Sequence, residues 1–149
     1  MADRCKDHEA VRRQLGREPR PFEVAARCPF GLPSVIENEK SRNMPTTFWL
    51  TCPSLDRAIA RIESAGGVRR AQKEVGEKTV EEIHARHLER FGSRVAGVRE
   101  GGYVKCLHAF TALHLSGSIP NAVAQWTLSR LESSYPEDGC CTLRDKKND

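Results

Sequence analysis

The chain has 149 residues, which is enough for one domain with a core of its own. Hydrophobic residues make up 38% of the sequence and charged residues 30%, a balance that indicates a soluble globular protein. The formal net charge of +4 is mild and the arginines are spread along the chain, so a solvated surface is favoured over nucleic-acid binding, which stays open.

The sequence disfavours both membrane insertion and secretion. No apolar run reaches the roughly 20 residues of a membrane span, and residues 1–6 lack the apolar core of a signal peptide. We therefore expect a cytoplasmic protein with no membrane partner. In that compartment the six cysteines are expected as thiols, metal ligands or redox groups rather than as structural disulfides.

The first third of the chain predicts a helix followed by short extended segments. A thin apolar stripe among charges indicates a helix over residues 5–15, and residues 22–27 are expected to be extended. Two prolines and a glycine prevent Cys28–Pro33 from being helical and predict a shaped loop. Ser34–Glu37 and the β-branched, aromatic run Thr46–Thr51 read as strands that could pair as a hairpin.

The rest of the chain predicts helices. Apolar residues at spacings of three and four indicate a helix over residues 53–65, with Pro53 at its first position. Residues 68–77 are charged and read as a loop, and a second helix is expected over residues 78–91. Residues 103–115 are apolar nearly all round, which marks a buried segment, and a last helix is expected from Pro120 to about Ser133.

These segments predict the fold class and the domain organisation. We expect an α+β fold: a single small domain over residues 1–134, with a short two- or three-stranded sheet packed by four to five helices. Residues 135–149, including Cys140 and Cys141, are polar and are expected to form a disordered tail.

Three cysteines lie where an irregular stretch meets a regular one: Cys28, Cys52 and Cys106. Together with His108, or with His84 or His87, they could bind a metal. A Cys₃His set suits structural zinc, whereas three thiolates with an open position suit a [4Fe–4S] cluster. The separations are long and lack Cys-x-x-Cys pairs, so buried inert cysteines and redox thiols stay open as alternatives.

Cys52 and Cys106 are also candidates for a catalytic thiol. If Cys52 caps the helix that begins at Pro53, the free backbone N–H groups there would favour a thiolate. Cys106 and His108 can share a site only if the following helix begins at Leu107 or later, because within a helix they would lie 160° apart. His84 and His87 are expected to form a packing pair rather than a ligand pair.

Two basic residues, Arg27 and Lys105, each precede one of these cysteines. Their side chains could hold an anionic substrate or cofactor. Alternatively, both side chains are simply exposed to solvent, and the sequence favours neither interpretation. The sequence thus leaves three hypotheses open. They are a metal or iron–sulfur protein, a metal-free thiol enzyme with Cys52 or Cys106 as nucleophile and His108 as a candidate base, and a non-catalytic interaction module that presents residues 28–33 to a partner.

At these residues the chain resembles a bacterial family known as domain of unknown function 501. The motifs that carry the resemblance, over about residues 5–130, are Arg27–Pro33, Pro45–Pro53, Gly66–Val68 and Lys105–Ala109. The family pattern continues with His where this chain has Phe110, and with Asn-Pro where it has Pro120-Asn121. The resemblance implies no known activity, but it favours a functional cysteine cluster over inert core cysteines.

Overall fold

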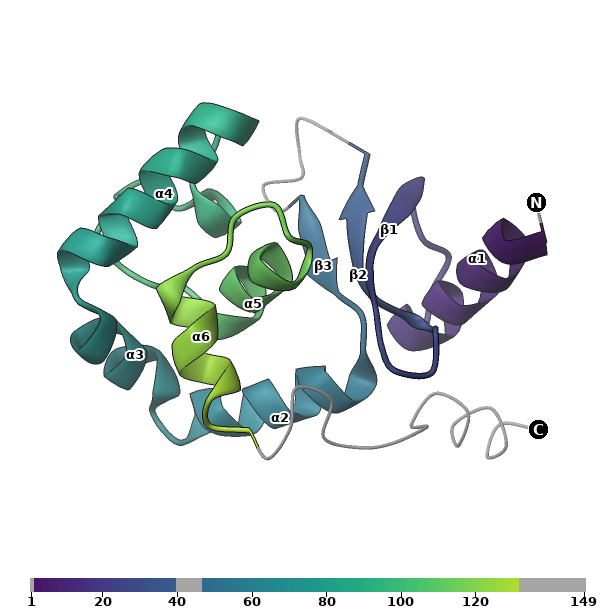
Figure 1. The fold of residues 1–149 in the computed structure, drawn as a ribbon, viewed down its shortest axis with the longest axis horizontal. Coiled ribbons are helices and arrows are strands. Elements are labelled where there is room, and N and C mark those ends of the chain that lie inside the picture. Colours follow the sequence, from purple (N-terminus) through teal and green to yellow (C-terminus); the bar gives the residue numbers. More distant parts are fainter. Residues whose placement is uncertain (1, 40–46, 132–149) are drawn as a thin grey trace.

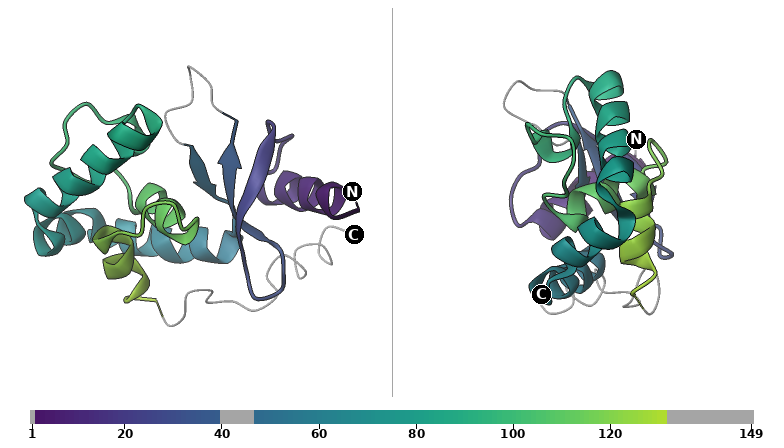
Figure 2. Two further views of the ribbon diagram at one scale, coloured as in Figure 1. Left: turned by 45° about the horizontal axis from the view of Figure 1, so that its top comes forward. Right: turned by 90° about the vertical axis from the view of Figure 1, so that its left-hand side faces the viewer.

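The computed structural model describes residues 2–39 and 47–131, and the side chains from residue 6 onward within them. Along its longest axis the molecule has helix α1 (Ala2–Leu15) at one end, a small sheet in the middle and helices α2 to α6 at the other end (Figures 1 and 2). The predicted α+β single domain is confirmed. The predicted tail and the cysteines within it lie outside the described residues.

The sheet is an antiparallel meander of three strands: β1 (Phe22–Arg27), β2 (Pro33–Asn38) and β3 (Phe48–Leu50). The expected pairing of the two later strands is confirmed, since Ile36 lies opposite Trp49. β1 adds to the other side of β2, and its register shifts around Ala25 and Ala26, which marks a β-bulge. β1 is therefore an edge strand.

The loop between β1 and β2 is a tight hairpin turn. The N–H of Gly31 donates to the carbonyl of Cys28 (2.9 Å), and the N–H of Cys28 donates to the carbonyl of Leu32 (2.9 Å). Gly31 has φ +80°, a left-handed conformation that suits glycine, and Pro29 fixes the preceding corner. The prolines and the glycine thus shape the turn, and Phe30 lies at its tip.

Five helices follow the sheet: α2 (Pro53–Ser64), α3 (Gly67–Val75), α4 (Glu77–Phe91), α5 (Leu107–Leu115) and α6 (Ala122–Leu128). A short 3-10 turn, η1 (Val95–Gly97), lies between α4 and α5. The prediction of a loop over residues 68–77 was wrong, and α3 accounts for a sixth helix where four or five were expected. Its apolar residues are few, but Val68, Ala71 and Val75 share one face and pack on the core.

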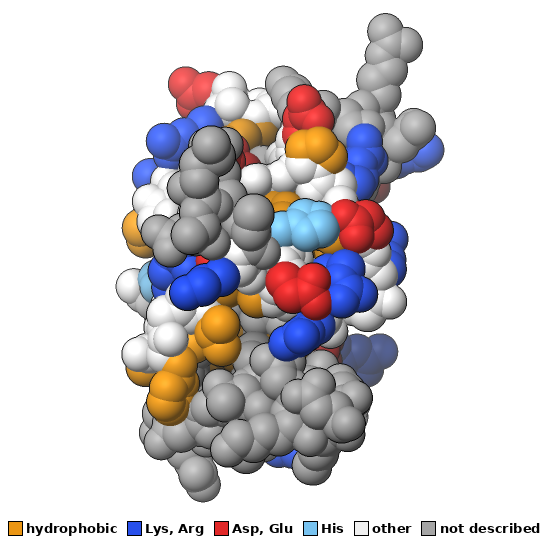
Figure 3. All heavy atoms as spheres, turned by 90° about the vertical axis from the view of Figure 1, so that its right-hand side faces the viewer, with side chains coloured by type: hydrophobic (Ala, Val, Ile, Leu, Met, Phe, Trp, Pro, Cys, Tyr) orange, Lys and Arg blue, Asp and Glu red, His pale blue; other side chains and the backbone are white. Residues whose placement is uncertain are grey.

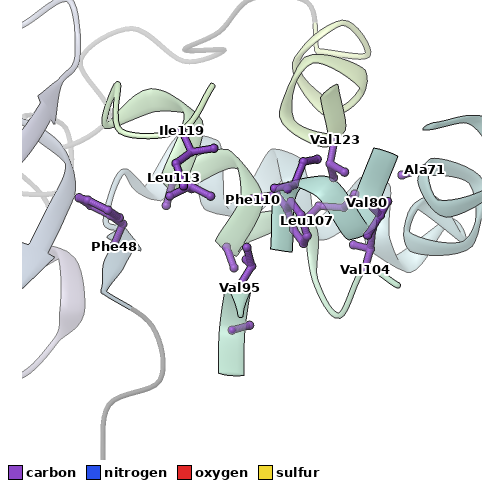
Figure 4. Packing of buried hydrophobic residues seen from close by; sticks show 14 of the residues in the cluster. Phe48, Ala71, Val80, Val95, Val104, Leu107, Phe110, Leu113, Ile119 and Val123 are labelled. Carbon is purple, nitrogen blue, oxygen red and sulfur yellow. The ribbon is translucent and has the colours of Figure 1, made fainter. Parts of the chain in front are cut away.

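Different parts of the chain pack on the two faces of the sheet. Val35 and Phe48 join the main core, which α5 fills with the fully buried side chains of Leu107 and Phe110 (Figure 4). Ile36 and Trp49 lie on the opposite face, where Arg17 of the α1 region lies over the Trp49 ring at 5.4 Å. The helical end therefore holds the large core, and α1 covers the other face of the sheet.

Candidate functional site

The guanidinium of Arg27 bonds to other residues of the chain rather than being available to bind a substrate. Its guanidinium forms a bidentate pair with Asp7 of α1 (2.9 and 2.7 Å) and donates to the carbonyl of Gly31 (2.8 Å). One side chain thus ties α1 to β1 and also closes the hairpin turn. Lys105, the other basic residue predicted to hold an anion, is exposed.

Cys28 and Cys52 lie in different surroundings. Cys28 is half-buried in the hairpin turn. Cys52 is the N-cap of α2 with Pro53 at the first helical position, as predicted, but its side chain makes no capping hydrogen bond to the helix. Cys52 is only 3% exposed and packs with Leu55 against Leu50, Leu115 and Leu131. Its surroundings are those of a small core residue.

Cys106 is the N-cap of α5, which begins at Leu107, so the condition for a shared site with His108 is met. The thiol nevertheless lies in a setting that opposes a thiolate. Burial is the largest cause and raises the pKa of Cys106. The Ala109 N–H lowers this pKa, the nearby Glu63 carboxylate raises it, and Lys105 and the His108 N–H lower it by smaller amounts. This setting disfavours a nucleophile at Cys106.

His108 lies between two carboxylates of α2. Its Nε2 is 3.0 Å from Oδ1 of Asp56, and its Nδ1 is 3.1 Å from Oε1 of Glu63. The other oxygen of Glu63 accepts the N–H of Leu107 at 2.7 Å. Whichever ring nitrogen carries the hydrogen can donate to one of these carboxylates. The ring therefore fastens the start of α5 to α2.

The thiols of Cys52 and Cys106 lie at opposite ends of an antiparallel helix pair. The Cys52 cluster packs against Leu115, the last residue of α5, whereas Leu107 at its start is bonded to Glu63 near the end of α2. Nine helical residues span about 13 Å, far more than the spacing of thiolates on one zinc ion.

In the described part of the chain, no group of three or more His, Cys, Asp and Glu side chains is placed to hold a metal ion. The metal centre of Cys28, Cys52, Cys106 and His108 therefore stays a prediction without support from this arrangement, as does its occupant, zinc or [4Fe–4S].

The buried histidines fix a loop. Nδ1 of His84 accepts the N–H of Val95 (3.1 Å) and its Nε2 donates to the carbonyl of Tyr103 (2.9 Å), while Nδ1 of His87 donates to the carbonyl of Ser93. Burial is the largest cause that lowers the pKa of both rings. The buried rings therefore hold residues 92–104 against α4, and the expectation that His84 and His87 pack rather than bind a ligand stays a prediction.

A cleft of about 590 Å³ lies between α1 and the edge strand β1. Its lining is mixed in charge and partly apolar: Asp7, His8, Pro19, Arg20, Pro21, Phe22, Glu23, Val24 and Arg27. The sequence analysis missed this cleft because none of its residues except Arg27 belongs to a cysteine motif. The available signal was the proline-rich connector at residues 19–21, which directs the chain from α1 into an edge strand.

Comparison with known families gives one match, and the description of that family names no activity. Residues 24–91 match the family described as "Protein of unknown function (DUF501)", so the predicted resemblance is confirmed over that range. The match includes the motifs at Arg27–Pro33, Pro45–Pro53 and Gly66–Val68, and it ends before Lys105–Ala109. No curated protein and no solved structure matches the chain.

Among the helices in the described part of the chain, none is both long enough and apolar enough to cross a bilayer.

Proposed function

We propose that this protein is a non-catalytic interaction module that presents the β1–β2 hairpin to a partner protein. The observation that carries the proposal is Phe30 at the hairpin tip, whose side chain is 54% exposed. Two turn hydrogen bonds and the Arg27 guanidinium hold the backbone beneath it. A rigid aromatic side chain loses little conformational entropy on binding, which favours an anchor role.

The chemistry of the other motif residues also favours binding over catalysis. Burial opposes a thiolate at Cys106, and both nitrogens of His108 face carboxylates of α2. A metal-free thiol enzyme would need at least one of these groups free. We place the interaction in the cytoplasm on the basis of the sequence alone.

A zinc ion or [4Fe–4S] cluster held by Cys28, Cys52 and Cys106 is the competing hypothesis. It would require the two helix starts at Cys52 and Cys106 to come together, and α2 and α5 are fastened in another arrangement by Glu63 and His108. The interaction hypothesis needs no such rearrangement.

Site-specific photocrosslinking tests the proposal. A benzoylphenylalanine placed at position 30 should capture one discrete protein in the cells that make this chain. The same group at position 88 is the matched control, because Leu88 is also an exposed apolar residue, at 40%. The captured protein, once purified, should bind the Phe30→Ser variant at least about tenfold more weakly than the unchanged chain, a loss of about 1.4 kcal/mol. Equal affinity for the two would rule out the hairpin tip as the docking element.

A further inference from the structure

We propose that the free edge of β1 binds an extended peptide in which apolar residues flank a Lys or Arg. The inference deepens the proposed function and rests on it, because it gives the same hairpin a partner of defined chemistry. It concerns the edge of the strand and the cleft beside it, and not the tip at Phe30.

The hydrogen-bond pattern of the sheet shows which backbone groups of β1 face β2 and which face away from it. The N–H of Glu39 donates to the carbonyl of Pro21 (3.0 Å), so Pro21 directs its carbonyl toward β2. Backbone direction alternates along a strand, and Glu23 therefore also faces β2, opposite Glu37. Phe22 and Val24 direct their N–H and carbonyl groups away from the sheet. An added strand could bond to both residues.

The cleft between α1 and β1 can accept side chains of a peptide strand that pairs with β1. Phe22 and Val24 line it together with Pro19 and Pro21, so one wall is apolar. Side chains of an added strand alternate between the two faces, as those of β1 do. Peptide residues opposite Phe22 and Val24 would point to the cleft side, and apolar side chains fit there. The charged part of the lining is mixed, with Asp7 and Glu23 beside Arg20 and Arg27, so the apolar wall and not the charge sets the preference on that side.

The opposite face of the edge carries two neighbouring carboxylates. Glu23 and Glu37 lie directly opposite each other on neighbouring strands, and both are exposed. Like charges in this position destabilise a sheet. No ion pair to either carboxylate is found among the side chains of residues 6–39 and 47–131, and the exposed Glu39 lies two residues beyond Glu37. A Lys or Arg opposite Glu23 would relieve this repulsion. Figure 3 shows acidic and basic side chains interspersed at this end of the molecule.

A second copy of the chain is a poor occupant of the same edge. The bulge at Ala25 and the missing N–H of Pro21 confine regular pairing to residues 22–24. Two copies paired about this short stretch would place Glu23 opposite the partner's Glu23. Strands that are short, bulged and charged at the edge resist self-association, whereas a short basic peptide meets none of these obstacles.

Peptide titration followed by NMR tests the inference on the full ¹⁵N-labelled chain. The probes are acetyl-Thr-Val-Lys-Val-Thr-amide and the same peptide with Glu in place of Lys. The Lys peptide should bind at least about tenfold more tightly, with the largest amide shifts at Phe22 and Val24. A Lys peptide with N-methylated valines should lose binding, because it cannot donate to the strand edge.

Charge reversal provides the matched control. Glu23→Lys should reverse the preference so that the Glu peptide binds more tightly. Glu82→Lys changes the net charge equally at an exposed position of α4 and should leave the preference unchanged. Equal affinity for the two probes, no binding of either at millimolar concentration, or retained binding of the N-methylated probe would each overturn the inference.

The same titration separates the two proposals. Phe30→Ser should bind the Lys peptide as the unchanged chain does. If the hairpin tip captures a protein but the peptide does not bind, the edge inference fails and the proposed function stands. If the peptide binds but Phe30→Ser leaves the affinity for the captured protein unchanged, the role of the tip fails and the edge site stands.

Discussion

Different interactions stabilise the two ends of the molecule. At the helical end, α5 brings fully buried apolar side chains into a core shared by α3, α4, α6 and β3, and buried neutral histidines fix the loop that leads into it. At the hairpin end, α1 contributes Val11 to the interior, and an ion pair between Asp7 and Arg27 joins α1 to β1. Apolar burial provides most of the stability of a domain, and exposed ion pairs add little. The helical end is therefore the stable platform, and the hairpin end is the part suited to binding.

Two phenylalanines at opposite ends give the sharpest test of this difference. Phe110→Ala should cost about 3–5 kcal/mol of unfolding free energy, because it opens a cavity in the main core. Phe30→Ala removes the same atoms from an exposed turn and should change stability by less than about 0.5 kcal/mol. Urea unfolding of the two variants makes the measurement. A cost above about 1 kcal/mol for Phe30→Ala would show that the tip is packed and not available to a partner.

The buried histidines make the helical end sensitive to acid. Burial lowers the folded-state pKa of His84, His87 and His114, so below the ordinary value of about 6.5 the unfolded chain takes up protons first. Their contribution to stability is complete above that pH and is lost as the pH falls toward the folded-state values. Unfolding free energies measured between pH 7.5 and 5 should decrease accordingly.

His84→Gln separates this effect from the general acid sensitivity of carboxylates. The variant should be less stable at pH 7.5 by about 1–3 kcal/mol, because Val95 N–H and Tyr103 carbonyl lose a well-placed partner. Its loss of stability between pH 7.5 and 5 should be smaller than that of the unchanged chain. The same loss in both would assign the acid sensitivity to other groups.

At the hairpin end, Arg27→Lys should have a smaller effect. Lysine keeps the charge but cannot form the bidentate pair with Asp7 while also bonding to Gly31. We expect a loss of about 1 kcal/mol or less, because Arg27 is partly exposed. Hydrogen exchange should become faster in α1 and at the turn amide of Gly31 and stay unchanged in α5. Faster exchange spread over both ends would contradict the separate fastening of the two regions.

The sequence predicted the elements that are set by local patterns and missed those that are set by tertiary contacts. The Pro and Gly residues of the hairpin turn, the apolar face of α2 and the Cys52 N-cap are local features, and all are found in the structure. Helix α3 has only three apolar residues on its buried face and was read as a loop. Its helical state depends on neighbours such as α2, α4 and α6, which no local pattern reveals.

The candidate site shows the same limit. The cysteine motifs are visible in the sequence, but whether three thiols meet depends on how α2 and α5 lie against each other. Glu63 and His108 set that arrangement through long-range contacts. The cleft beside β1 was likewise hidden, because it is formed by a connector, a helix and an edge strand that carry no shared motif.

Cys28→Ser should also have a very small effect on stability, and it decides between the interaction hypothesis and the metal hypothesis. Cys28 is half-buried in the turn, where its backbone N–H and carbonyl form hydrogen bonds that a serine would keep, so the variant should unfold within about 0.5 kcal/mol of the unchanged chain. Zinc and iron measured after anaerobic purification should be the same in both proteins, well below one metal per chain. A three-thiol centre predicts the opposite, because a structural metal contributes its binding free energy to folding. One zinc or four iron atoms per chain, lost together with stability in Cys28→Ser, would favour the metal hypothesis and require Cys52 and Cys106 to come together in the metal-bound protein.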